Sequence, residues 1–114
     1  MRLKDYAKTL YEVNQDNKCY CIISDSVIDQ KLQIHQIDFD QWEYNRRTGQ
    51  VEGIDCLDEE NTKKFCEHFR ITTSPNLVRI IKREFGTDGI YFFLSNFREF
   101  CDDHHIKYSH EAWY

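Results

Sequence analysis

The first apolar residues of the chain recur every three or four positions, with charged residues between them. They are Leu3, Tyr6, Ala7, Leu10 and Val13. This spacing would place all five on one face of a helix, so the pattern predicts an amphipathic helix over residues 3–14. In residues 18–24 both alternating sets of positions are apolar. Such a run is typical of a strand in the interior of a sheet.

Between residues 31 and 44 the apolar side chains come in three pairs with a period of two. The pairs are Leu32 and Ile34, Ile37 and Phe39, and Trp42 and Tyr44. The alternation slips by one residue at His35-Gln36 and again at Asp40-Gln41, which predicts a long strand with up to two β-bulges. Residues 45–50 supply a turn, and residues 51–56 are expected to return as the second strand of a hairpin.

Helical spacing dominates the second half of the chain. Asp58 is a suitable N-cap for a helix that continues through Phe69. Ser74, followed by proline, is expected to cap a second helix that ends at Gly86. Asp88 is expected to open a third helix, whose apolar residues form one stripe as far as residue 101.

The order of these elements predicts an α+β fold. Residues 106–109 alternate in polarity and indicate a further edge strand. We therefore expect an antiparallel sheet of three to four strands with three to four helices packed on one face. The absence of regular strand–helix alternation argues against a doubly wound parallel sheet.

Composition is consistent with one folded domain over residues 1–114. Hydrophobic residues make up 40% of the chain and 17 residues are aromatic, which is enough to form a core. The N-terminal residues lack a signal-peptide pattern and no apolar run approaches 18 residues, so a soluble cytoplasmic protein is expected. The odd number of cysteines, five, favours reduced thiols over a disulfide framework.

Charge is unevenly distributed along the chain. Residues 25–60 contain ten acidic and three basic side chains, whereas the rest of the chain is slightly basic and the whole carries −5. If Ile37, Phe39, Trp42 and Tyr44 face the core, the carboxylates between them and on the return strand point outward. The alternative is a solvated sheet face that is acidic for solubility.

An outward carboxylate surface would attract a Lys/Arg-rich partner protein and occupy a groove made for phosphates, as a DNA mimic does. Amphipathic rings are suited to anchor such an interface. The residues predicted to contact the partner are Asp38, Asp40, Trp42, Glu43, Tyr44, Glu52, Asp55, Asp58, Glu59 and Trp113. For Trp113 the alternative to partner binding is a structural role, in which its side chain packs the C-terminal segment against the sheet.

The leading hypothesis is therefore a small non-enzymatic inhibitor of a basic, nucleic-acid-targeting protein. Toxin immunity proteins and phage-borne anti-defence proteins such as anti-CRISPR inhibitors are of this kind. No Gly-rich phosphate loop, nucleophile elbow or metalloprotease motif is present, and we expect no catalytic residue, cofactor, metal or membrane contact.

The alternative hypotheses use the cysteines, histidines and basic residues. Cys19-x-Cys21, Cys66-x-His68 and Cys101-x-x-His104 are candidate zinc ligands, but none has a standard zinc spacing. Cys101 with His104 or His105 could form a nucleophile and base, although Asp102 and Asp103 make the local field unfavourable for a thiolate.

Two further groups of charged residues have possible functions. Asp38 and Asp40 could bind a divalent cation, but a strand holds such carboxylates nearly 7 Å apart along the chain. The basic residues Arg79, Lys82 and Arg83 could pair with the acidic hairpin of a second copy and form a homodimer. Direct binding of nucleic acid is not expected for a chain with a pI of about 5.5.

Overall fold

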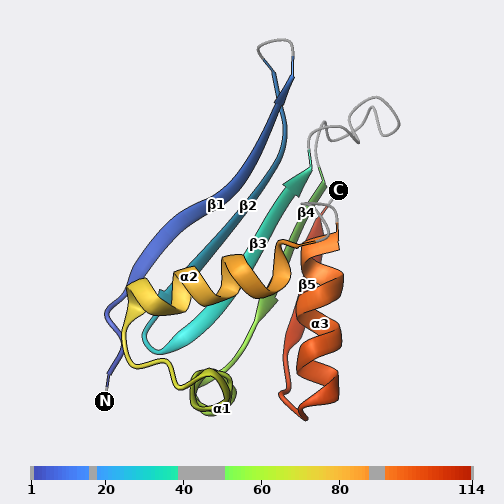
Figure 1. The fold of residues 1–114 in the computed structure, drawn as a ribbon. Helices are drawn as coiled ribbons and strands as arrows, with labels where there is room; N and C mark the ends of the chain where they lie inside the picture. Colours follow the sequence, from blue (N-terminus) through green and yellow to red (C-terminus); the bar gives the residue numbers. More distant parts are fainter. Residues whose placement is uncertain (1, 16–17, 39–50, 88–91, 114) are drawn as a thin grey trace.

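The computed structural model describes residues 2–15, 18–38, 51–87 and 92–113. They form a five-stranded antiparallel sheet in the order β1-β2-β3-β4-β5, with three helices inserted between β4 and β5 (Figure 1). The strands are β1 (Tyr6–Gln15), β2 (Lys18–Ile28), β3 (Lys31–Asp38), β4 (Val51–Cys56) and β5 (Ser109–Trp113). The helices are α1 (Glu59–Phe69), α2 (Ser74–Phe85) and α3 (Phe93–Asp103).

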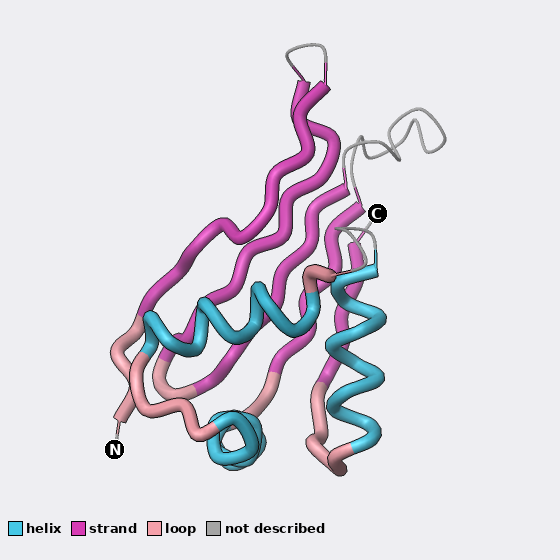
Figure 2. Tube along the Cα trace, in the orientation of Figure 1, coloured by secondary structure: helices cyan, strands magenta, loops and turns pink. Residues whose placement is uncertain are grey.

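The helices lie on one side of the sheet, and the core fills the space between the two layers (Figure 2). Phe65, Phe93 and Phe97 are completely buried there, together with Ile23 and Ile34 of the sheet. Phe65 packs against several other rings, including Phe97 at a centroid distance of 5.9 Å. Burial of these rings supplies much of the hydrophobic stabilisation of the fold, because aromatic side chains bury the largest apolar areas.

The turn between β2 and β3 is fixed by contacts with the segment that precedes β1. Asp29 and Gln30 have φ angles of 52° and 66°, as a two-residue hairpin turn requires. The Gln30 side chain accepts from the Leu3 N–H at 3.0 Å and donates to the Leu3 carbonyl at 2.7 Å. The Asp29 N–H donates to Asp5 Oδ1 at 3.0 Å. These bonds compensate for a turn sequence that contains no glycine.

The predicted α+β class is confirmed, but the predicted helix over residues 3–14 is wrong. This segment contains strand β1, which pairs antiparallel with β2 from Tyr6 to Gln15. The register shifts between Thr9 and Tyr11 and again between Val13 and Asn14. The first shift leaves Leu10 as an extra residue in β1, so the apolar positions around it have spacings of four and three that imitate a helix, whereas the extra residue of the second shift lies in β2.

The bulge predicted at His35-Gln36 is also wrong. Strand β3 pairs with β2 without interruption from Lys31 to Asp38, and with β4 from Gln33 to Asp38. Because alternation is unbroken, Ile37 lies on the face opposite Ile34, away from the helices. The expectation that Ile37 faces the core is therefore incorrect. The second predicted bulge and the turn at residues 45–50 lie outside the described residues.

The remaining predicted elements are found, several of them with shifted boundaries. The strand at residues 18–24 continues to Ile28, and residues 51–56 pair with β3 as expected. Helix α2 is capped by Thr73 and not by Ser74, since the Thr73 hydroxyl accepts from the Asn76 N–H. The last strand lies at residues 109–113 instead of 106–109. Within the described ranges, no helix is both long and apolar enough to cross a bilayer.

Candidate functional site

Most of the predicted partner-binding residues lie at or beyond the limits of the described structure. Residues 40 and 42–44 are outside it. Asp38, Glu52 and Trp113 have backbones in β3, β4 and β5, but their side chains are not among those described. The structure therefore places three predicted side chains, those of Asp55, Asp58 and Glu59.

Asp55 does not point outward as predicted, because its side chain is completely buried. It lies on the same side of the sheet as Leu57, facing the helices. Arg98 of α3 binds it in a bidentate manner, with Nε 2.7 Å from Oδ2 and Nη2 3.1 Å from Oδ1. The charge of Asp55 is thus neutralised within the molecule and is removed from the proposed acidic surface.

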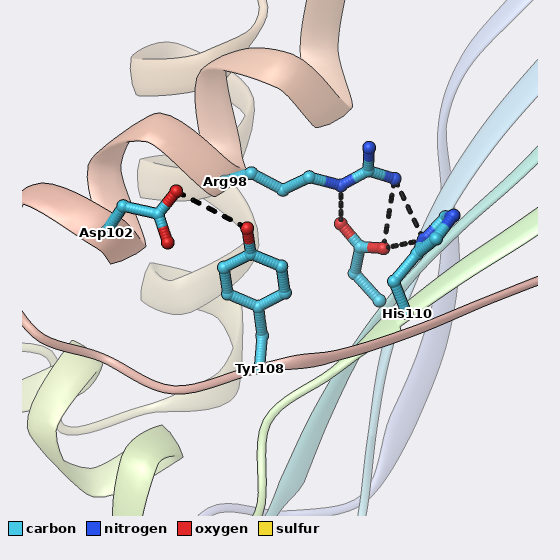
Figure 3. Close-up of polar contacts among 5 residues, drawn as sticks. Arg98, Asp102, Tyr108 and His110 are labelled. Atoms are coloured by element: carbon cyan, nitrogen blue, oxygen red, sulfur yellow. Dashed lines mark hydrogen bonds and ion pairs between the residues drawn. The ribbon is translucent and has the colours of Figure 1, made fainter.

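His110 of β5 completes this buried cluster. Its Nδ1 forms a hydrogen bond with Asp55 Oδ1 and lies 2.9 Å from Arg98 Nη2. Figure 3 shows Arg98 and His110 converging from α3 and β5, with Tyr108 nearby, whose hydroxyl contacts Asp102 at 3.5 Å. Because Asp55 belongs to β4, the cluster joins α3 and β5 to the middle of the chain. Its geometry is that of a structural ion pair.

Asp25 is a second buried carboxylate, in the same cross-strand row as Ile34 and Asp55. It is 1% exposed, and its Oδ2 accepts from the Tyr6 hydroxyl at 2.6 Å. Its Oδ1 has no hydrogen-bond partner among the described residues. Burial raises the pKa of Asp25 to about 6, although the hydrogen bond from Tyr6 acts in the opposite direction.

The first turn of α1 is the acidic surface that the structure does describe. Asp58, Glu59 and Glu60 are exposed in succession. Asp58 is the N-cap, because its Oδ1 accepts from the Asn61 N–H at 2.8 Å and from the Asn61 amide at 2.9 Å. These bonds lower the pKa of Asp58. Glu59 and Glu60 favour the positive end of the helix dipole and leave their carboxylates in solvent.

A hollow of about 370 Å³ lies beside this turn. Its lining combines apolar and charged side chains from the N-terminal segment, the β2–β3 turn, α1 and the loop after α1. The residues are Leu3, Gln30, Glu59, Thr62, Lys63, Cys66, Glu67 and Ile71. Leu3, Cys66 and Ile71 are buried, whereas Glu59, Lys63 and Glu67 are exposed. We call this hollow, together with Glu60, the α1 site.

The sequence predicted Glu59 but not the hollow next to it. The lining residues come from three separate parts of the chain, and only the packing of the N-terminal segment against the β2–β3 turn brings Leu3 to α1. Spacing along α1 could have linked Glu59 with Lys63 and Glu67, which are four residues apart on one helix face. Nothing in the sequence indicates that Leu3 and Ile71 complete the lining.

The candidate cysteine and histidine sites are only partly brought together. The rings of His68 and His104 lie 4.3 Å apart on α1 and at the end of α3. Across the described part of the chain, no group of three or more metal-binding side chains converges. Burial raises the pKa of the Cys66 thiol to about 11 and that of Cys101 to about 12, so both thiols are protonated at neutral pH.

Comparison with known proteins adds no further information on the site. No protein-family model, curated protein or solved structure matches this chain.

Proposed function

We propose that this protein is a non-enzymatic binding protein that occludes a basic surface of a nucleic-acid-targeting partner protein, in the manner of a toxin immunity protein or a phage-borne anti-defence inhibitor. The observation on which the proposal depends is the α1 site, where the exposed Glu59 and Glu67 line a hollow together with buried apolar residues. Asp55 of the return strand is neutralised within the molecule. The α1 site therefore takes the place of that strand as the described part of the proposed contact surface.

The α1 site is suited to a long basic side chain. The aliphatic part of an arginine or lysine would pack on Leu3 and Ile71, and its cation would meet Glu59 and Glu67 at the rim. Lys63, which lies between the two glutamates on the helix, limits the number of cations that the site accepts. Glu60 extends the negative surface outside the hollow and would accelerate encounter with a basic partner.

The proposal is tested by removing charge from the α1 site without changing its shape. We suggest the triple variant Glu59→Gln, Glu60→Gln and Glu67→Gln as bait in extracts of the source cells, analysed by quantitative mass spectrometry. A matched control removes the same number of charges from other exposed positions, by Glu84→Gln, Glu99→Gln and Asp103→Asn. The two variants have the same net charge, so they differ only in where the charge is lost.

We expect the wild type and the control to retain a basic partner that the α1 variant loses. With the purified partner, Kd should rise about tenfold or more in the α1 variant, and added salt should weaken the wild-type complex. The partner's nucleic-acid activity should fall in proportion to the wild-type protein added. Equal Kd values for both variants, or a partner that keeps its activity in the complex, would refute the proposal.

A further inference from the structure

A second surface, formed by the edge strand β1 and helix α2, has the opposite charge. Helix α2 crosses the face of the sheet and begins next to β1 (Figure 1). It is fixed to this part of the chain at two points. The Ser74 hydroxyl donates to the Lys4 carbonyl at 2.6 Å, and the Tyr11 hydroxyl donates to the Lys82 carbonyl at 3.2 Å.

Two hollows lie between β1 and α2. The first, of about 260 Å³, has a mainly apolar lining formed by Tyr6, Ala7, Lys8, Ser74, Pro75 and Val78. The second, of about 390 Å³, is basic and is lined by Tyr11, Arg79, Lys82, Arg83, Gly86 and Thr87. We call the two together the β1–α2 groove.

The groove is positively charged although the protein as a whole carries −5. Lys8, Arg79, Lys82 and Arg83 are all exposed. Among the described residues, one of these four cations forms an ion pair, that of Arg83 with Glu84 at 3.0 Å. Lys82 Nζ lies 5.3 Å from the centroid of the Tyr11 ring, in the range of a cation–π contact.

The backbone beside the first hollow is available for pairing. In the described sheet β1 has a neighbour on one side only, β2. From Tyr6 to Thr9 the register with β2 is regular, so every second residue directs its N–H and C=O away from β2. Ala7, Lys8 and Thr9 are exposed. The register shift after Thr9 limits the length over which another strand can pair.

We propose that the β1–α2 groove binds an extended acidic peptide segment of a partner protein, which pairs with β1 as an additional strand. The peptide backbone would bond to the outer edge of β1 between Tyr6 and Thr9. Its apolar side chains would enter the hollow beside Pro75 and Val78, and its carboxylates would meet Arg79 and Arg83. Edge pairing supplies affinity in this mode of recognition and the hollows supply specificity. The inference is independent of the α1 site.

Charge argues against one other occupant of the groove, and hydrogen bonding argues against another. A second copy that paired its own β1 about a two-fold axis would bring two basic α2 helices together, which like charges oppose. A nucleic acid strand would satisfy the cations but could not use the alternating donors and acceptors of β1, because phosphates accept hydrogen bonds and do not donate them.

The test uses the full chain to select binders from a phage-displayed library of random linear peptides. We expect the enriched sequences to be acidic with interspersed apolar residues. The strongest binder, synthesised with a fluorescent label, should bind in solution with Kd below about 100 μM by anisotropy. When the peptide is added, hydrogen exchange should slow at those amides of residues 6–9 that point away from β2. Methylation of alternate peptide nitrogens, which removes strand pairing but keeps every charge, should abolish binding.

Variants then separate the groove from general electrostatics. Arg79→Glu with Arg83→Glu should raise Kd about tenfold or more, whereas Lys31→Glu with Lys64→Glu, a control of equal charge at exposed positions elsewhere, should change it less than about twofold. The proposal is overturned if no acidic sequence is enriched, if the methylated peptide binds equally well, or if the control loses as much affinity.

Displacement of the peptide by single-stranded oligothymidylate at a lower concentration than unlabelled peptide would assign the groove to nucleic acid. A wild-type dimer in light scattering that the Arg79/Arg83 variant abolishes would assign it to a second copy.

Discussion

The two buried aspartates of the sheet differ in the partners that their carboxylates have. Asp25 and Asp55 lie in one cross-strand row on either side of Ile34, and both are inaccessible to solvent. Asp55 has a bidentate arginine and a histidine. Asp25 has one hydrogen bond from Tyr6 and an oxygen without a described partner. Equal burial thus produces a stable ion pair in one case and a carboxyl with a raised pKa in the other.

The difference shows that burial alone does not decide the cost of a carboxylate in this sheet. Desolvation penalises the charged form at both positions. The net cost of the charged carboxylate then depends on the cations and hydrogen-bond donors that neighbouring elements supply. Helix α3 and strand β5 supply them to Asp55. Beside Asp25, Lys8 of β1 is the cation that favours ionisation, and Lys8 is itself exposed.

The largest effect is expected from Arg98→Met. The substitution leaves a buried carboxylate with His110 alone, and the free energy of unfolding should fall by about 3 kcal/mol. Chemical denaturation of the purified protein measures the change. Arg79→Met, which removes an exposed arginine from α2, is the control and should cost less than about 0.5 kcal/mol. A cost for Arg98→Met as small as that of the control would show that Asp55 does not need the arginine.

Asp25→Asn should change the free energy of unfolding in the opposite direction to Arg98→Met and stabilise the protein at pH 8. The pKa of Asp25 rises from 3.8 to about 6 on folding, so the folded state holds the proton more tightly than the unfolded state does. The stability that this proton contributes to the wild-type protein is therefore fully present below pH 3.8 and is lost as the pH rises through 6. A pKa shift of this size corresponds to about 3 kcal/mol of lost stability at pH 8, which the substitution restores. The unpaired N–H donors of the new amide reduce this gain by about 1 kcal/mol. We expect a net gain of about 2 kcal/mol at pH 8 that disappears near pH 4. A gain that is independent of pH would disprove ionisation as its cause.

Tyr6→Phe should destabilise the protein by about 1.5 kcal/mol at pH 8, because it removes the hydrogen bond that the ionised Asp25 accepts. Near pH 4 the carboxyl is neutral and the cost should be smaller. In an Asp25→Asn background the Tyr6→Phe cost should also be reduced, which a double-mutant cycle measures. Additive effects at both pH values would mean that the two side chains do not interact.

The smallest effect is expected from His110→Gln. Its ring is 38% exposed, and Arg98 remains on Asp55 after the substitution, so the cost should be about 0.5 kcal/mol. Denaturation curves of this variant and of Arg98→Met, compared at one pH, rank the two partners of Asp55. A larger loss for His110→Gln than for Arg98→Met would reverse the assignment of the arginine as the principal partner.

The sequence predicted most helices and strands but misinterpreted two interruptions of the apolar pattern. In β1 a real bulge after Thr9 made a strand resemble a helix. In β3 the apparent slip at His35-Gln36 is a change of face, since Ile37 lies on the side without helices. Both patterns are irregular runs of apolar residues. Only the pairing with neighbouring strands distinguishes them, and local spacing contains no information on that pairing.

The candidate site was less predictable than the fold. The prediction that Asp55 points outward depended on the assumption that Ile37 and the apolar residues after it face the core, and Ile37 lies on the opposite face. The compensating Arg98 lies 43 residues away along the chain. Glu59 was correctly expected to be exposed, as its position in the first turn of a capped helix implies. The hollow beside it depends on Leu3 and Ile71, whose proximity is a property of the tertiary structure.

The position of β5 has a consequence for the order in which the protein is assembled on the ribosome. Strands β1 to β4 follow one another along the sheet, but β5 pairs with β4 only after all three helices have been translated. Until β5 has been translated the outer edge of β4 has no partner and Asp55 lacks His110, and until α3 has been translated Asp55 also lacks Arg98. Before α3 is translated, the nascent chain therefore presents an open strand edge next to an uncompensated carboxylate, whose charge disfavours pairing with other nascent chains.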